Sequence, residues 1–128
     1  MAENETAKKV IIAVDDMAIS LTSVRTILQR EYDVRLAKSA SLALEMLKVI
    51  KPSLILIDIE MPEISGLEFA GLIKKNEEYR HIPVIFITSH ANAQFIDKAL
   101  DLEADGYIVK PFAPEALLKR VKSVLGEE

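Results

Sequence analysis

Four short apolar segments of this chain each lead into a side chain that can do chemistry. They are residues 10–14 before Asp15 and Asp16, residues 54–59 with Asp58, residues 83–87 before Thr88, and residues 106–109 before Lys110. Carboxylates are oxygen ligands of the kind that Mg²⁺ prefers, and a carboxylate can also act as a nucleophile that takes up a phosphoryl group. Gathered at one place, these groups predict a divalent-cation site that accepts phosphate.

The same segments have the composition of buried parallel strands, because they are short, apolar and bounded by turn residues. They alternate with segments of helical periodicity, and a weaker fifth strand fits residues 33–36. This alternation predicts an α/β fold, a single doubly wound (βα)5 domain whose parallel five-stranded sheet has helices on both faces. Ligand sites of such sheets lie beyond the carboxyl ends of the strands, where the reactive side chains are expected.

The segments between the strands carry helix signals. Ser65 opens a predicted capping box, Pro114 suits a first helical turn, and Gly126 suits a helix stop. The second helix is expected to end at Lys51 and Pro52. The apolar positions of the five helices are Leu21, Val24 and Leu28; Ala40, Ala43, Leu44 and Leu47; Leu67, Ala70 and Ile73; Phe95, Ile96, Ala99 and Leu100; and Leu117, Leu118, Val121, Val124 and Leu125.

Composition limits the classes of function. Half of the 128 residues are hydrophobic, which predicts one folded domain over residues 9–126, after a flexible tail of residues 1–8. The net charge of −4 and the lack of a basic run predict no direct binding to nucleic acid. There is no cysteine and no apolar stretch long enough for a membrane span. A cytoplasmic protein without membrane insertion is therefore expected.

Four motifs carry a resemblance to a known family. They are VDD at 14–16, DIEMPEISG at 58–66, FITS at 86–89 and YIVKPF at 107–112. In this order, over essentially the whole chain, they resemble the receiver domain of two-component response regulators. The resemblance implies a flavodoxin-like sheet of strand order 2-1-3-4-5. It also implies a phosphoacceptor in a histidine-to-aspartate phosphorelay, which is no conventional enzyme but catalyses its own phosphorylation and slow dephosphorylation.

The resemblance assigns a metal site to the acidic residues. Asp16 and Asp58 would bind Mg²⁺ directly, Asp15 through water, and Glu60 through its main-chain carbonyl, and Mn²⁺ could substitute. The residue types also call for a cation. Two carboxylates about 4 Å apart repel by roughly 4 kcal/mol at an effective dielectric constant near 20.

The remaining site residues complete the predicted chemistry. Asp58 is the expected phosphoacceptor, Lys110 supplies a compact positive charge, and the Thr88 hydroxyl and Ser89 main-chain N–H donate to the phosphoryl oxygens. Ser89 is also small enough to leave access for a phosphodonor. In the family the bond before Pro111 is cis, which would aim Lys110 inward.

The resemblance also predicts how phosphorylation is read out. Thr88 is expected to move toward the phosphoryl group and to free space that Tyr107 fills by turning inward. This would change the face made by the helix around residues 95–100, the strand 106–109 and the last helix, through which a homodimer could also form. Glu60 and His90 would border the phosphoryl group and influence its lifetime.

The expected partners are a sensor histidine kinase or a histidine phosphotransfer protein, and a downstream target that the sequence leaves open. Glu103 stands where the family commonly has glycine, and it predicts an altered loop before the last strand.

Other interpretations of these residues stay open. Asp15 or Asp16 could cap the first helix, and Tyr107 could be an ordinary half-buried strand residue. A phosphohydrolase of the haloacid-dehalogenase type would need DxDx(T/V) after the first strand, where this chain has DDMAI. The glycines form neither GxGxxG nor a P-loop, which disfavours a nucleotide-binding protein. An interaction module that keeps only the fold is the remaining alternative.

Overall fold

The computed structural model describes residues 7–89 and 93–127. Within these residues, strands and helices alternate along the chain. In order they are β1 (Val10–Val14), α1 (Ala18–Leu28), β2 (Asp33–Ala37), α2 (Ala40–Leu47), β3 (Leu54–Asp58), α3 (Gly66–Lys75), β4 (Val84–Thr88), α4 (Ala93–Asp101), β5 (Gly106–Val109) and α5 (Pro114–Leu125). His90 and residues 1–6 of the expected tail lie outside the described residues.

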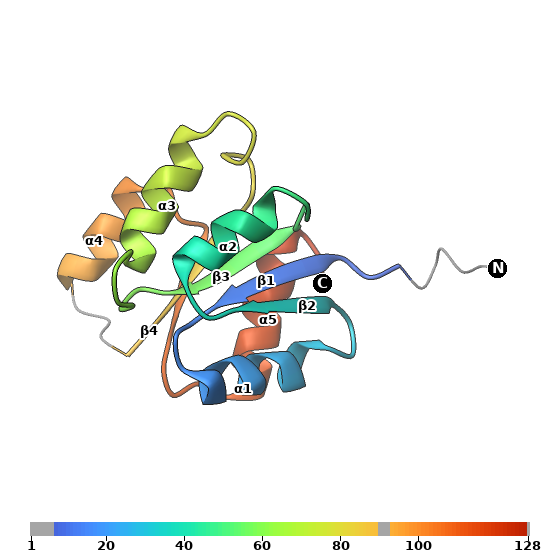
Figure 1. The fold of residues 1–128 in the computed structure, drawn as a ribbon. Helices are drawn as coiled ribbons and strands as arrows, with labels where there is room; N and C mark the ends of the chain where they lie inside the picture. Colours follow the sequence, from blue (N-terminus) through green and yellow to red (C-terminus); the bar gives the residue numbers. More distant parts are fainter. Residues whose placement is uncertain (1–6, 90–92, 128) are drawn as a thin grey trace.

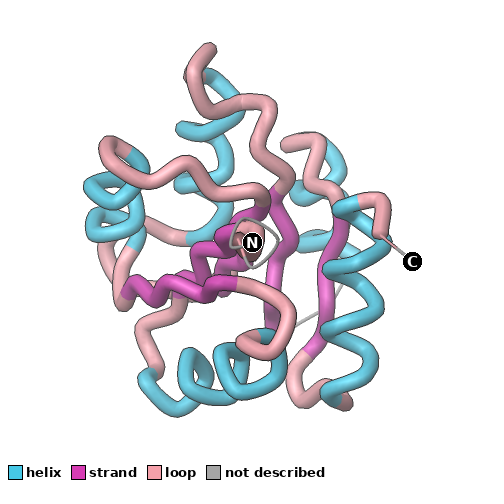
Figure 2. The backbone as a smooth tube through the Cα atoms, turned by 90° about the vertical axis from the view of Figure 1, so that its right-hand side faces the viewer, coloured by secondary structure: helices cyan, strands magenta, loops and turns pink. Residues whose placement is uncertain are grey.

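The strands form one parallel sheet of order β2-β1-β3-β4-β5, which confirms the predicted fold and strand order. Figure 1 shows α2, α3 and α4 on one side of this sheet and α1 and α5 on the other. Figure 2 shows the sheet enclosed between these two layers of helices. Because helices cover both faces, the central strands are apolar at successive positions rather than at alternate ones, up to Asp58 and Thr88 at the ends of β3 and β4.

Successive strand residues enter two separate cores. In β1, Ile12 and Val14 pack with residues of α2, α3 and α4, whereas Ile11 and Ala13 pack with residues of α1 and α5. The same alternation continues along β3 and β4. It follows from the period of two in a strand, and it also decides which face the side chain at each strand end approaches.

The predicted helix signals are present in the structure. The Ser65 side chain accepts the Glu68 N–H while the Glu68 side chain accepts the Ser65 N–H, so the capping box is formed. Pro114 lies in the first turn of α5, and Gly126 ends that helix in the left-handed conformation. Among the described residues, no helix is both long and apolar enough to cross a bilayer.

One helix prediction was wrong in detail, and one apolar helix position lies outside the core. Leu100 is 66% exposed. The inner stripe of α4 runs through Phe95 and Ala99 and continues in Leu102, at the spacing of i, i+4 and i+7. The second helix ends at Leu47, because the chain then enters a turn in which Met46 O accepts the N–H groups of two following residues.

Glu103 adopts a backbone conformation that is unusual for a residue other than glycine. It follows α4 with φ of +58°, in the left-handed region, and the Ala104 N–H donates back to Ala99 O at 3.0 Å. This is the helix stop at which glycine is favoured, because a side chain there costs about 1–2 kcal/mol.

Replacing this residue by glycine should therefore stabilise the protein. Glu103→Gly removes the conformational cost but makes the unfolded chain more flexible. We expect a net gain of about 0.5–1 kcal/mol in the free energy of unfolding, measured by urea denaturation. Asp101→Gly, in the last turn of the same helix, is the control and should lose about 0.5–1 kcal/mol. A Glu103→Gly variant that is less stable than the unaltered chain would contradict this account.

Candidate functional site

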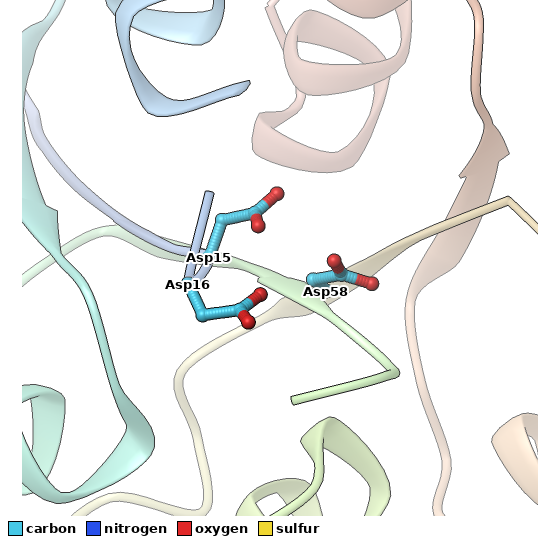
Figure 3. A group of neighbouring side chains, drawn as sticks. All are labelled: Asp15, Asp16 and Asp58. Atoms are coloured by element: carbon cyan, nitrogen blue, oxygen red, sulfur yellow. The ribbon is translucent and has the colours of Figure 1, made fainter. Parts of the chain in front are cut away.

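Three aspartates meet at the carboxyl edge of the sheet. Asp15 and Asp16 follow β1, Asp58 ends β3, and these two strands are neighbours whose register pairs Val14 with Ile57. Each aspartate offers a carboxylate oxygen, and these oxygens all lie within 4.8 Å of one another. Figure 3 shows the three side chains side by side at the two strand ends. The pairing of β1 with β3 therefore brings together residues that are 42 or more positions apart, as Asp58 and Asp16 show.

Lys110 supplies the cation in this cluster. Its Nζ donates to Asp15 Oδ2 at 2.8 Å and to Asp58 Oδ2 at 3.3 Å. The residue follows β5, two strands away from β3 in the sheet, and its side chain reaches back across the edge. The Lys110–Pro111 peptide bond is cis. Asp15 and Asp58 are both buried, so the ammonium group offsets a repulsion that water screens little.

The electrostatics of this pair of carboxylates favours a second cation. Burial and the charge of Asp15 raise the pKa of Asp58, against the opposing effects of Lys110 and of the Glu60 N–H, which donates to Asp58 Oδ1 at 3.1 Å. Burial by itself lowers the pKa of Lys110, but the hydrogen bond and charge of Asp15, together with Asp58, outweigh it and raise the net value. Lys110 thus keeps its positive charge, whereas burial and the charge of Asp15 make ionisation of Asp58 costly.

The donor set fits a hard divalent cation. Three carboxylates offer oxygen ligands, and Asp16 is exposed, which leaves one side of the cluster open to water. Mg²⁺ binds in this way, with few protein carboxylates and several retained waters. Neither aspartate caps α1, because the helix begins after Met17 without a side-chain cap. Instead, Asp15 Oδ1 accepts the Met17 N–H at 3.0 Å, which fixes the carboxylate next to Lys110.

Thr88 lies on the face of the sheet opposite to the face that Asp15 and Lys110 approach. It is 2% exposed and closes β4, where it pairs in register with Val109 of β5. It lines a small cavity that also includes Tyr107 and residues of α4, namely Phe95, Ile96 and Ala99, together with Ile59. Tyr107 lines this cavity while 39% of its surface stays exposed. Thr88 and Tyr107 therefore line the same small cavity.

Ser89 lies on a groove that opens on the other face of the site. The groove has a volume of about 630 Å³ and is lined by Asp15, Ile19, Ser20, Ser23, Val24, Ile87, Ser89, Lys110, Pro111 and Phe112. Ser89 is exposed there, as its predicted role in leaving access requires. Glu60 is exposed beside Asp58.

Two residues near the site were missed from the sequence. Ser20 Oγ accepts a hydrogen bond from Lys110 Nζ at 3.2 Å. The sequence pattern of this helix indicated only its apolar positions. Gly66 begins α3 with its N–H donating to Ile59 O at 2.8 Å. A Cβ atom on Gly66 would lie 2.2 Å from Asp58 O, so only glycine lets the loop fold back onto this strand end. The glycine at the end of the motif at 58–66 could have indicated this close approach from the sequence.

The comparison with known proteins identifies the family. The sequence model of the response regulator receiver domain matches residues 11–122. The chain therefore belongs to the family of two-component response regulator receiver domains.

Relatives place this domain in proteins of different length. The chain is 32% identical to the polar-differentiation response regulator DivK of Brucella ovis, over 93% of this chain and 98% of that protein. It is also 32% identical to Histidine kinase P4 of Formosa agariphila, over 94% of this chain but 9% of that protein. The structure resembles that of the chemotaxis protein CheY4 of Vibrio cholerae, with a TM-score of 0.88 at 29% identity, over 92% of this chain and 99% of that one.

The close approach at Gly66 gives a test of the site's framework. Gly66→Ala should push the 59–65 loop away from Asp58 and lower the free energy of unfolding by about 1–3 kcal/mol. The matched control is Gly71→Ala in the same helix, where a Cβ atom meets nothing closer than a Leu102 side-chain atom at 3.8 Å. That change should instead raise stability by about 0.5–1 kcal/mol through helix propensity. Equal effects of the two substitutions in urea denaturation would rule out the close contact.

Proposed function

We propose that this chain accepts a phosphoryl group on Asp58 in a Mg²⁺-dependent reaction, with a phosphohistidine of a sensor histidine kinase or of a histidine phosphotransfer protein as donor. The observation that carries the proposal is the placement of the Lys110 ammonium group between Asp15 and the buried Asp58, with Asp16 alongside. A carboxylate, a fixed positive charge and a metal-binding oxygen set are the groups that phosphoryl transfer requires.

In the transfer, one carboxylate oxygen of Asp58 forms a bond to phosphorus while the bond from phosphorus to the donor nitrogen breaks. The electron pair of that bond stays on the donor nitrogen, and the group leaves as neutral imidazole because its other ring nitrogen carries a proton, so this chain need not supply one. Lys110 lies near enough to Asp58 to stabilise charge on the phosphoryl oxygens. The Thr88 hydroxyl and Ser89 N–H are the proposed further donors. Bound Mg²⁺ would neutralise part of the carboxylate charge and polarise the phosphoryl group.

The hydrogen bonds at the site support the proposed division of the metal ligands. Asp15 already accepts the Met17 N–H with one oxygen and Lys110 with the other. This favours a water-mediated role for Asp15 and direct ligation by Asp16 and Asp58. The main-chain carbonyl of Glu60 is the proposed third protein ligand, and Mn²⁺ is expected to substitute for Mg²⁺.

The cavity between Thr88 and Tyr107 supports the proposed switch. Movement of Thr88 toward a phosphoryl group would enlarge the cavity that both residues line, and Tyr107 would fill it.

Leu100, Tyr107 and Val109 are exposed on α4 and β5. Exposed apolar residues that gather on one face favour a protein contact. We propose that the α4–β5–α5 face binds the output partner, or a second copy of the chain, and that Glu60 and His90 tune the phosphoryl lifetime. A cytoplasmic location stays a prediction.

Intact-mass measurement tests the phosphoacceptor. With Mg²⁺ and acetyl phosphate the chain should gain one phosphoryl group that hydroxylamine removes, and EDTA should prevent the gain. Asp58→Asn should abolish it, whereas Asp97→Asn, an exposed carboxylate on α4, should not. Since Asp58→Asn removes the repulsion from Asp15, the variant should unfold at or above the temperature of the unaltered chain. Rapid release of many equivalents of phosphate would identify a phosphohydrolase instead.

Fluorotyrosine NMR tests the switch. The chain has three tyrosines, so the signal of each ring can be followed separately. Addition of beryllofluoride and Mg²⁺ should shift the ring signal of Tyr107 and reduce its solvent isotope effect, while the buried Tyr32 stays unchanged. Tyr107→Phe assigns the signal. Thr88→Ala should suppress the response of Tyr107 although beryllofluoride still binds. An unaltered Tyr107 signal in the beryllofluoride complex would exclude this coupling.

A further inference from the structure

Lys110 has a third acceptor that the chemistry described above does not use. An ammonium group has three N–H donors. Those of Lys110 have acceptors in Asp15 Oδ2 at 2.8 Å, Ser20 Oγ at 3.2 Å and Asp58 Oδ2 at 3.3 Å. The three acceptors match the full donor capacity of the group, which is held in a partly buried site with 17% of the side chain exposed.

Ser20 reaches Lys110 because of how the sheet orients its strand ends. Ile108 packs in the core that includes α1 and α5, and Lys110 lies two residues further along the chain, on the same face. Ser20 stands near the start of α1, where its N–H donates to Met17 O at 3.1 Å and fixes the backbone. Its side chain is short, so ordering the hydroxyl costs little conformational entropy.

A neutral hydroxyl suits this position better than the alternatives. An acidic residue would add a further negative charge to a cluster that already holds three carboxylates. An apolar residue would leave one ammonium N–H without an acceptor in a partly buried site, which is costly. Serine satisfies the donor without changing the charge.

The distances show what the hydroxyl does to the ammonium group. Asp15 and Ser20 both lie on the α1 side of Lys110, and the contact with Asp58 is the longest of the three. A charge-assisted hydrogen bond has an ordinary length of about 2.7–2.9 Å, which the Asp15 contact meets and the Asp58 contact does not. The ammonium group thus lies near enough to Asp58 to stabilise a phosphoryl oxygen but without a tight bond to the attacking carboxylate.

We propose that Ser20 is a positioning residue for Lys110 in phosphoryl transfer to Asp58, an inference that rests on the proposed function. Without the hydroxyl, Lys110 would move toward Asp58 and make its oxygen a weaker nucleophile. Net hydrogen-bond energies of about 0.5–1.5 kcal/mol correspond to a two- to tenfold slower maximal rate of phosphorylation. The half-saturating concentration of acetyl phosphate should not change, because Ser20 acts through Lys110.

The decisive comparison is between Ser20→Thr and Ser20→Val, which have the same shape and differ in the hydroxyl. Ser20→Thr should retain the maximal rate, and Ser20→Val should lose it together with Ser20→Ala. Ser23→Ala is the matched control, since Ser23 lies on the same helix and lines the same groove. If Ser20→Ala is poorly folded, the threonine and valine pair still decides the question.

A second measurement is independent of phosphorylation. In protein with ¹⁵N-labelled lysine, the Lys110 ammonium signal, assigned by its loss in Lys110→Arg, should shift and exchange faster with water in Ser20→Val but not in Ser20→Thr or Ser23→Ala. An unchanged ammonium signal in Ser20→Val, or a rate equal to that of Ser20→Thr, overturns the role of Ser20. Failure of the unaltered chain to accept a phosphoryl group would instead reject the proposed function, whatever the ammonium signal shows.

Discussion

Repulsion between carboxylates at one edge of the sheet is the constraint on which the rest of the site depends. Asp15 and Asp58 are both buried, and like charges about 4 Å apart cost roughly 4 kcal/mol even at an effective dielectric constant near 20. Lys110 offsets part of this cost by donating to both. The remaining imbalance, seen in the raised pKa of Asp58, favours the binding of a further cation. The cluster of like charges therefore costs stability at this edge of the sheet.

The alternation of side chains along the strands places the acidic cluster and the cavity beside Thr88 on opposite faces of the sheet. Asp15 and Lys110 approach α1 and the groove on that face, whereas Thr88 and Tyr107 line a cavity against α4. Lys110 follows β5, the strand that carries Tyr107, and β5 pairs with β4, which ends at Thr88, so the two sets are joined through neighbouring strands. A charge added at Asp58 could therefore act on the α4 face through Thr88 without rearrangement of the core. The exposed Leu100 belongs to the helix on that face.

The sequence predicted the fold well because its signals are local and strong. Continuous apolar runs marked the strands to within a residue. Ser65 and Gly126 marked helix ends through local hydrogen bonds, and Pro114 marked a helix start through its fixed backbone angle. The sequence pattern did not indicate which apolar positions of a helix face the sheet. Leu100 is one position away from the inner stripe of α4, and that stripe is set by packing against the sheet rather than by the local pattern.

By itself the sequence determined which groups are available for chemistry and that they follow strands, and the resemblance to receivers added their expected roles. Only the tertiary structure decided which groups touch. Asp15 holds Lys110 instead of capping α1, Ser20 supplies a third acceptor, and Gly66 packs against the backbone of Asp58. The physical reason is that these contacts join residues up to 95 positions apart. They depend on strand order, register and side-chain direction together, and no local pattern in the sequence records that combination.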